Sequence, residues 1–176
     1  FLTTMANSYG ARWFDENWVP QFDQPEWKAV MTDYVELLTK YGPPGASNNG
    51  YNENLTLSLQ GKCAMRMDAT VSAGSLTDPA QSEFADKVGF ALAPDMGLGK
   101  RANWLWAWSL AIPASSDAKD AAKTFVNWAT NKEYLALVAS KEGWANVPPG
   151  TRTSLYANPE YAKVPFAKMT LDSINS

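Results

Sequence analysis

The sequence has no histidine, only one cysteine and no long apolar run. The absence of histidine excludes Ser-His-Asp and Cys-His catalysis, and it excludes a zinc site built from cysteine and histidine. A single cysteine, Cys63, excludes an intrachain disulfide. No apolar stretch approaches the ~20 residues that a membrane span requires. Carboxylate chemistry, tyrosine chemistry and simple binding therefore remain.

Positive charge is also scarce relative to negative charge. The chain has 15 Lys+Arg and 18 Asp+Glu, which gives a net charge of −3. Nucleic-acid surfaces need clustered positive side chains that displace counterions from phosphates. We therefore expect no nucleic-acid partner.

Tryptophan, by contrast, is abundant. The 176 residues include eight Trp, seven Tyr and seven Phe, and 45% of the residues are hydrophobic, which is a globular composition. A buried indole needs a hydrogen-bond partner for its N–H, so interiors rich in tryptophan are uncommon. The flat apolar ring also suits the C–H face of a sugar. A tryptophan-rich core and a sugar-type site are both consistent with this composition.

The two ends suggest a piece of a longer protein. The chain opens at Phe1, without a methionine or a signal peptide, and closes at Ser176 inside a helical pattern.

Helices are predicted by apolar spacing and by start and stop signals. Asp23, Pro25 and Glu26 have the pattern of a capping box ahead of an amphipathic helix. Thr130 and Glu133 have the same pattern, and Asp68 is a candidate N-cap. The expected helices cover residues 1–10, 25–40, 53–60 (with a strand as the alternative), 69–74, 118–129, 130–141 and a last one from 158, interrupted at Pro165.

Three segments alternate in the manner of strands, namely residues 62–68, 87–92 and 103–113. In the first, Cys63, Met65 and Met67 share one face, which we expect to be buried. In the third, the best strand in the chain, Trp104, Trp106 and Trp108 share a face. Strands separated by helices indicate an α/β fold.

Several blocks in this order resemble the extracellular solute-binding proteins of bacterial ABC importers, in particular the sorbitol/mannitol-binding branch. The blocks are 12–16 (RWFDE), 41–45 (YGPPG), 61–65 (GKCAM) with 68–70 (DAT), 103–108 (NWLWAW) with 111–113 (AIP), and 149–154 (PGTRTS). The resemblance implies a periplasmic-binding-protein-like fold of type II. Family members are longer, so it also implies a partial fold, mostly of the second lobe.

The family fold implies three parts. Residues 1–108 would belong to the second lobe. Residues 109–147 would cross the hinge and supply helices to the first lobe. Residues 148–176 would cross back and end in a second-lobe helix.

The resemblance also implies a ligand site at the lobe interface. Asp68 matches the DAT block and lies at a strand end, where open α/β sheets place ligands. Arg66 shares its strand face, although this position is usually apolar or aromatic in the family. A surface ion pair or a helix cap is the structural alternative for both. The full set of candidate ligand-binding residues is Asp68, Trp106, Trp108, Arg152, Trp104, Asn103 and Arg66.

The implied function is capture of a polyol or small sugar, such as sorbitol or mannitol, by closure of two lobes. We expect no catalytic residue, no metal and no cofactor. The expected partners are the ligand and the transmembrane subunits of an ABC permease, in the periplasm. Self-association of the truncated chain is a further expectation. A carbohydrate-active enzyme or binding module, and an isolated interaction domain, are the alternatives.

Overall fold

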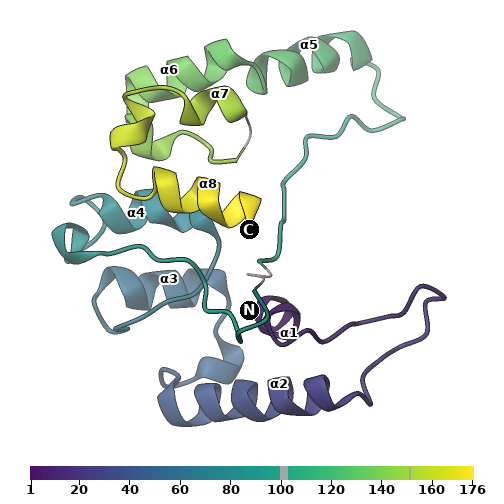
Figure 1. Ribbon diagram of the computed structural model, residues 1–176. Helices are drawn as coiled ribbons and strands as arrows, with labels where there is room; N and C mark the ends of the chain where they lie inside the picture. The colour runs from purple at the N-terminus through teal and green to yellow at the C-terminus, as the bar shows by residue number, and fades with distance from the viewer. Residues whose placement is uncertain (100–102, 151) are drawn as a thin grey trace.

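The computed structural model describes residues 1–99, 103–150 and 152–176, and the secondary structure of these residues is helical (Figure 1). The α-helices are α1 (Leu2–Ser8), α2 (Pro25–Glu36), α3 (Tyr51–Leu59), α4 (Ala73–Thr77), α5 (Lys119–Ala129), α6 (Lys132–Glu142), α7 (Thr153–Tyr156) and α8 (Ala167–Asn175). A π-helical turn, Leu37–Tyr41, continues α2. Short 3-10 turns cover Ala46–Asn48, Thr70–Ser72, Ala85–Lys87, Trp144–Asn146 and Tyr161–Lys163.

The three predicted strands do not pair with one another. Within the described parts of the chain, residues 62–68, 88–92 and 103–113 lie outside any β-ladder, and the single bridge joins Phe14 to Pro20. The prediction of three strands is therefore wrong for this chain, because these segments of the described chain form no backbone hydrogen bonds to one another. Alternation shows which face a strand would cover, but a strand forms only where a neighbouring segment accepts and donates its backbone hydrogen bonds.

The first predicted strand, residues 62–68, is largely exposed because no neighbouring segment of the described chain pairs with it or covers it. Met65 is 91% exposed and Met67 37% exposed, while Cys63 is partly buried. The expected burial of this face is wrong, because no layer of the described chain covers it.

One core joins α1 to α2. Its buried residues are Met5, Ala6, Ala11, Trp27 and Val30. The indole N–H of Trp27 donates to the carbonyl of Arg12 at 2.6 Å, and the hydroxyl of Tyr9 donates to the carboxylate of Asp33. These bonds fix the start of the α1–α2 connection and the end of α1 against α2.

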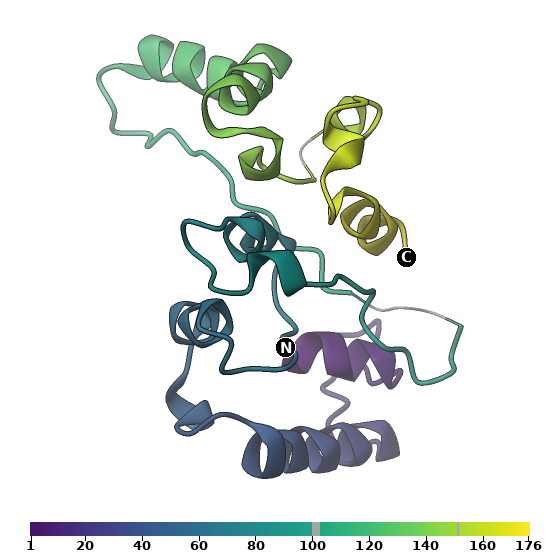
Figure 2. The ribbon, with the colours of Figure 1, turned by 90° about the vertical axis from the view of Figure 1, so that its left-hand side faces the viewer.

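A second core joins helices that are far apart in sequence. Its buried residues are Ala73, Leu135, Ala139, Val147, Leu155, Tyr161, Val164, Phe166 and Ala167. They come from α4, α6, α7, α8 and the segments between them, so this core draws on all three expected parts of the chain. The part boundaries at residues 108 and 147 remain predictions. Figures 1 and 2 show the α1–α2 pair and the α5–α7 group at opposite ends of the molecule, with α3 and α4 between them.

Helix positions are mostly as predicted, whereas several caps are not. The N-cap of α2 is Gln24, not Asp23, and its side chain accepts no capping bond. The N-cap of α6 is Asn131, one residue after the expected Thr130, and its carbonyl oxygen Oδ1 accepts from the N–H of Tyr134 at 2.8 Å. Asn is at least as good an N-cap as Thr, so the sequence pattern alone did not show which of Thr130 and Asn131 caps α6.

The helix preferred for residues 53–60 is confirmed over the strand, but α3 begins two residues earlier, at Tyr51, and ends at Leu59 with Gln60 as its C-cap. Gly61 ends this helix with φ of +66°, a conformation that favours glycine. A Cβ atom at Gly61 would lie 2.1 Å from the ring of Phe84, so the close approach also requires glycine.

Candidate ligand-binding site

Three tryptophan rings form a row along the extended segment that begins at Asn103. The rings of Trp104 and Trp106 are nearly parallel, at an interplanar angle of 3° and a centroid distance of 5.5 Å. The rings of Trp106 and Trp108 lie 4.9 Å apart at 43°. The side chains fall on one side because successive residues of an extended backbone point in opposite directions. The alternation in the sequence predicted this shared side.

The tryptophan row faces open space in this chain. Trp104 is 54% exposed, Trp106 58% and Trp108 87%, so the reading of these residues as core of the chain itself is wrong. A row of exposed indoles offers flat apolar faces for C–H groups and N–H donors for hydroxyl oxygens. Such a surface suits a polyol or a sugar.

Asp68 and Arg66 are brought together as the sequence suggested. The guanidinium nitrogen Nη2 of Arg66 lies 2.9 Å from the carboxylate oxygen Oδ2 of Asp68. The other carboxylate oxygen, Oδ1, accepts from the N–H of Ala69 at 2.7 Å. Asp68 is not an N-cap, because Ala69 holds that position for the Thr70–Ser72 turn. Each carboxylate oxygen keeps acceptor capacity for a further donor.

Tyr51 completes this group, and the sequence analysis did not identify it. The guanidinium carbon of Arg66 lies 5.0 Å from the centroid of the Tyr51 ring, a cation–π distance. Nη2 also reaches the carbonyl of Tyr51 at 3.5 Å. Tyr51 opens α3 and Arg66 follows that helix by several residues of irregular chain, so no local spacing in the sequence indicates the contact.

Arg66 is a mostly buried charge with unused donors. Its side chain is 10% exposed, and its Nε and Nη1 atoms are buried without a hydrogen-bond acceptor. The ion pair therefore holds the carboxylate of Asp68 in one orientation, with an exposed fraction of 28%. Asp68 is the member of the pair that can meet a ligand.

Asn103 lies at the end of a helix. Its side-chain nitrogen Nδ2 donates to the carbonyl of Ser173 at 3.0 Å and to the hydroxyl of Ser176 at 2.8 Å. The carbonyl of Ser173 belongs to the last turn of α8, where backbone acceptors lack partners within the helix. Asn103 thereby ties the start of the tryptophan row to α8.

Arg152 has a similar role at another helix end. Both its Nε and Nη2 donate to the carbonyl of Thr130, which is the C-cap residue of α5. A cation near a helix C-terminus interacts favourably with the helix dipole. These two hydrogen bonds place Arg152 on the corner between α5 and α6.

The candidates thus fall into separate groups. The contacts of Asp68 are with Arg66 and Ala69, and the ring contacts of Trp106 are with its two neighbouring tryptophans. Among the described residues, no group of three or more Asp, Glu, His or Cys side chains is placed to hold a metal ion. No helix within those residues is long and apolar enough to span a bilayer.

The fold is that of part of a solute-binding protein of the periplasmic-binding-protein type. The family model described as bacterial extracellular solute-binding protein matches residues 1–136, so this chain belongs to that family. It is 56% identical over 173 residues to the mannitol-binding protein of Pseudomonas aeruginosa. That match covers 98% of this chain and 40% of the relative.

Two solved structures extend the comparison. An ABC transporter solute-binding protein from Agrobacterium vitis S4, with bound D-mannitol, is 68% identical with a TM-score of 0.93. The match covers 99% of this chain and 42% of that one. A solute-binding protein from Agrobacterium radiobacter K84, in complex with ribitol, is 27% identical with a TM-score of 0.81, over 99% of this chain and 43% of that one. The chain thus spans about two fifths of the length of these relatives.

These matches clarify the fold class. The architecture is part of a type II periplasmic-binding-protein fold, as the resemblance implied. The backbone of this chain, including its long segments without β-pairing, superposes on part of a solved structure that is more than twice as long.

Proposed function

We propose that this chain forms part of the solute-binding component of a bacterial ABC importer, and that its ligand is mannitol or a closely similar polyol. The observation that carries the proposal is the row of exposed tryptophans in a chain with 68% identity to a protein whose structure holds D-mannitol. The proposed place of action is the periplasm, and the proposed partners are the transmembrane subunits of the permease.

The proposed mechanism is capture without chemical turnover. Two lobes close on the polyol about a hinge, and the closed form engages the permease. We propose that residues 1–108 and 148–176 contribute to one lobe and residues 109–147 to the hinge and the other lobe. The bond from Arg152 to Thr130 joins two of these parts, which supports a hinge role for the segment around Arg152.

Within this mechanism the tryptophan row is the apolar floor of the site. Closure removes the polyol from water, so each hydroxyl needs a protein partner to replace the lost hydrogen bonds. Indole faces cover the carbon chain of the polyol, and the N–H groups of Trp106 and Trp108 are available as donors. We propose these two residues, with Trp104 beside them, as ligand contacts.

Asp68 is the proposed acceptor for ligand hydroxyls. An ionised carboxylate can accept from two vicinal hydroxyl groups, and such charge-assisted bonds are stronger than neutral ones. Arg66 acts through Asp68: it neutralises and orients the carboxylate and is itself covered by the Tyr51 ring. Asn103 and Arg152 are proposed as positioning residues, since their side chains donate hydrogen bonds to helix ends.

Calorimetric titration with mannitol tests the proposal. The protein used is a chain of the relatives' length that contains this sequence. Asp68→Ala should weaken binding about ten- to a hundred-fold, since losing one charged hydrogen-bond partner costs about 1–3 kcal/mol. Trp106→Ala and Trp108→Ala should weaken it by a similar factor through loss of the apolar floor.

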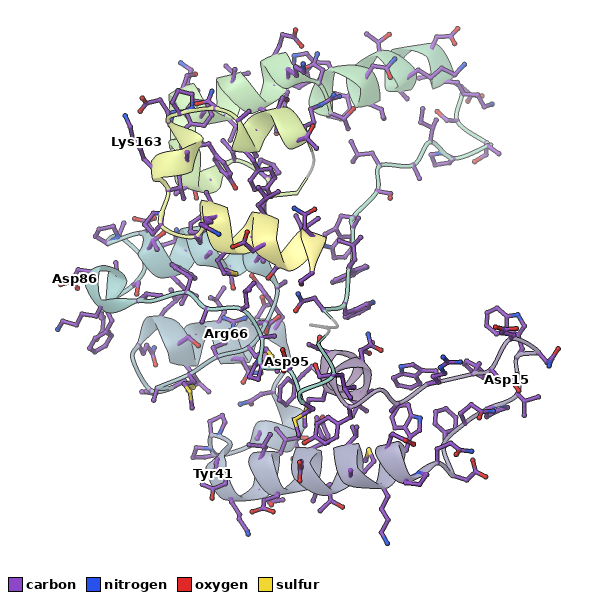
Figure 3. All side chains as sticks on the ribbon, in the orientation of Figure 1. Asp15, Tyr41, Arg66, Asp86, Asp95 and Lys163 are labelled. Carbon is purple, nitrogen blue, oxygen red and sulfur yellow. The ribbon has the colours of Figure 1, made fainter. Side chains whose placement is uncertain are left out.

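The matched control for Asp68 is Asp86→Ala, which removes an exposed aspartate from the Ala85–Lys87 turn (Figure 3). It should leave the affinity unchanged. Equal binding by the parent and Asp68→Ala shows that Asp68 has only a structural role. If the parent binds neither mannitol nor another polyol or simple sugar, the proposed function is wrong.

A further inference from the structure

The peptide bond between Asn49 and Gly50 has the chemistry of a spontaneous modification site. It is the one Asn-Gly pair in the sequence. It lies between the Ala46–Asn48 turn and α3, where Asn49 is partly exposed and Gly50 is the N-cap residue. The backbone nitrogen that follows an asparagine can attack the side-chain amide carbon, and glycine has no Cβ atom to hinder the approach. Deamidation is therefore chemically favoured at this pair.

The reaction needs no reagent except water. A bond forms between the backbone nitrogen of Gly50 and the Cγ atom of Asn49, and the C–N bond of the side-chain amide breaks. The amide nitrogen leaves as ammonia and takes with it the proton that the Gly50 nitrogen loses. Water then opens the cyclic imide at one of its two carbonyl carbons. Opening at Cγ gives aspartate, and opening at the backbone carbonyl gives isoaspartate, in which the main chain runs through the former side chain.

Glu53 restrains this reaction in the folded chain. Its carboxylate oxygen Oε2 accepts from the N–H of Gly50 at 2.9 Å. The Gly50 nitrogen must lose its proton to attack, and a carboxylate beside it opposes the negative charge that develops there. Asn49 has a ψ of 126°, and ring closure requires a rotation that brings the Gly50 nitrogen round to the side of Cβ. That rotation breaks the bond to Glu53 and opens the first turn of α3.

The pair lies directly before Tyr51, which contacts the proposed polyol site. The Tyr51 ring lies 5.0 Å from the guanidinium carbon of Arg66, and the Tyr51 carbonyl lies 3.5 Å from Nη2 (Figure 3). Nη2 in turn lies 2.9 Å from the carboxylate of Asp68. Isoaspartate at position 49 lengthens the main chain next to the N-cap, so it displaces the first turn of α3 and the Tyr51 ring with it.

The two products therefore differ in their effect. An ordinary aspartate at position 49 leaves the length of the main chain unchanged. Its negative charge lies close to the N-terminus of α3, where a helix dipole makes negative charge favourable. Isoaspartate is the product that disturbs the contact between Tyr51 and Arg66.

We propose that Asn49–Gly50 is a deamidation site that Glu53 keeps slow, and that its conversion to isoaspartate separates Tyr51 from Arg66 and weakens polyol binding at Asp68. The link to binding rests on the proposed function. The restraint by Glu53 does not, because it concerns only the chemistry of the Asn49–Gly50 bond.

The first test measures the rate of deamidation. A chain of the relatives' length that contains this sequence is incubated in mildly alkaline buffer, and peptides that span residues 49–50 are quantified by mass spectrometry and by enzymatic methylation of isoaspartate. Glu53→Ala should deamidate about fivefold faster than the parent, the factor that corresponds to loss of one capping bond. Glu53→Gln should be intermediate, because its amide oxygen still accepts from Gly50 but carries no charge. Gly50→Ala, which keeps Asn49 and Glu53, is the matched control and should deamidate more slowly than the parent.

The second test measures mannitol affinity by calorimetry before and after incubation. The isoaspartate form of the parent should bind mannitol about three- to tenfold more weakly, the factor that corresponds to one cation–π contact. Gly50→Ala should keep its initial affinity over the same period. Asn49→Asp, which reproduces the other product, should bind as the fresh parent does.

Four results would overturn all or part of the inference. Absence of deamidation in both the parent and Glu53→Ala refutes the modification site. Slower deamidation of Glu53→Ala than of the parent shows that the carboxylate promotes the reaction as a base. An isoaspartate form that binds mannitol as tightly as the fresh parent refutes the link through Tyr51. A fresh parent that binds no mannitol refutes the proposed function and that link, whereas the deamidation rates still test the restraint by Glu53.

Discussion

The guanidinium of Arg152 donates two hydrogen bonds to the backbone carbonyl of Thr130, from Nε at 3.0 Å and from Nη2 at 2.8 Å. The two residues lie in different expected parts of the chain. Thr130 is the C-cap residue of α5, so no N–H group of that helix donates to its carbonyl. A single side chain therefore fastens the returning segment to the corner between α5 and α6.

Arg152→Met should lower the free energy of unfolding by about 1–2 kcal/mol, because it removes two bonds from a charged donor. Arg152→Lys should recover only part of the loss, since an ammonium group lacks the fork geometry of a guanidinium. Urea denaturation followed by tryptophan fluorescence measures both. Lys123→Met, which removes an exposed cation from α5 itself, is the control and should have little effect. A reduced mannitol affinity without any loss of stability would instead make Arg152 a ligand contact.

Asn103→Ala should destabilise the protein by about 1 kcal/mol, since it removes two donors from the C-terminal turn of α8. Asn103→Asp should cost more, because a carboxylate cannot donate to the Ser173 carbonyl and is repelled by the helix C-terminus. Thermal melting ranks the two variants. Should Asp be tolerated better than Ala, the side chain is not acting as a donor to α8.

Among the described residues, two buried hydroxyl groups have no hydrogen-bond partner, that of Tyr161 in the second core and that of Thr170 in α8. Each residue is fully buried. Burying an unpaired hydroxyl costs about 1–3 kcal/mol, so Tyr161→Phe and Thr170→Val should leave stability unchanged or increase it. Denaturant midpoints provide the measurement. Tyr156→Phe is the matched control, because the Tyr156 hydroxyl accepts from the N–H of Gly150 at 2.9 Å, and its loss should be destabilising.

Stability should fall as the pH rises above 10. The hydrogen bond to the Asp33 carboxylate, with burial and the negative charge of Asp33, raises the pKa of Tyr9 to about 12. Burial, followed by the charge of Tyr156, raises the pKa of Tyr161 to about 12. A folded-state pKa above the unfolded value of about 10 gives a contribution that is fully present below pH 10 and lost as pH rises toward 12. Tyr9→Phe should lose less stability than the parent between pH 10 and 12. An identical decline in both proteins would assign the effect to other groups.

The apolar stripe expected along residues 121–138 is only half covered. Leu135 is buried and Val138 packs against the second core, but Phe125 is 57% exposed and Trp128 43% exposed. Exposed apolar patches of this kind favour association. We predict that the 176-residue chain on its own associates as its concentration rises, and that Phe125→Glu reduces this in sedimentation velocity. Thr124→Glu adds the same charge to α5 without removing a ring and should reduce it less. A chain that stays monomeric at high concentration contradicts the prediction.

Local signals were sufficient for most helices. The apolar spacing from Trp27 to Tyr34 predicts α2. Pro165 interrupts the last helical segment, as expected, but the part before it is only the 3-10 turn Tyr161–Lys163 and not the predicted α-helix from residue 158. These features depend on residues within one or two turns, where backbone hydrogen bonds are short in sequence. The N-cap of α6 was predicted one residue too early because Thr130 and Asn131 are both good N-cap residues, although Asn is the better of the two.

The sequence by itself determined the helices, the shared side of Trp104, Trp106 and Trp108, and the family blocks that predicted a polyol binder. Each depends on residue type and short-range spacing. Only the tertiary structure decided that Tyr51 covers Arg66, that Asn103 reaches Ser173, and that the predicted strands remain unpaired. These features depend on which distant segments lie side by side, because a side-chain donor needs an acceptor and a strand needs a neighbouring strand, and either partner can come from anywhere in the sequence.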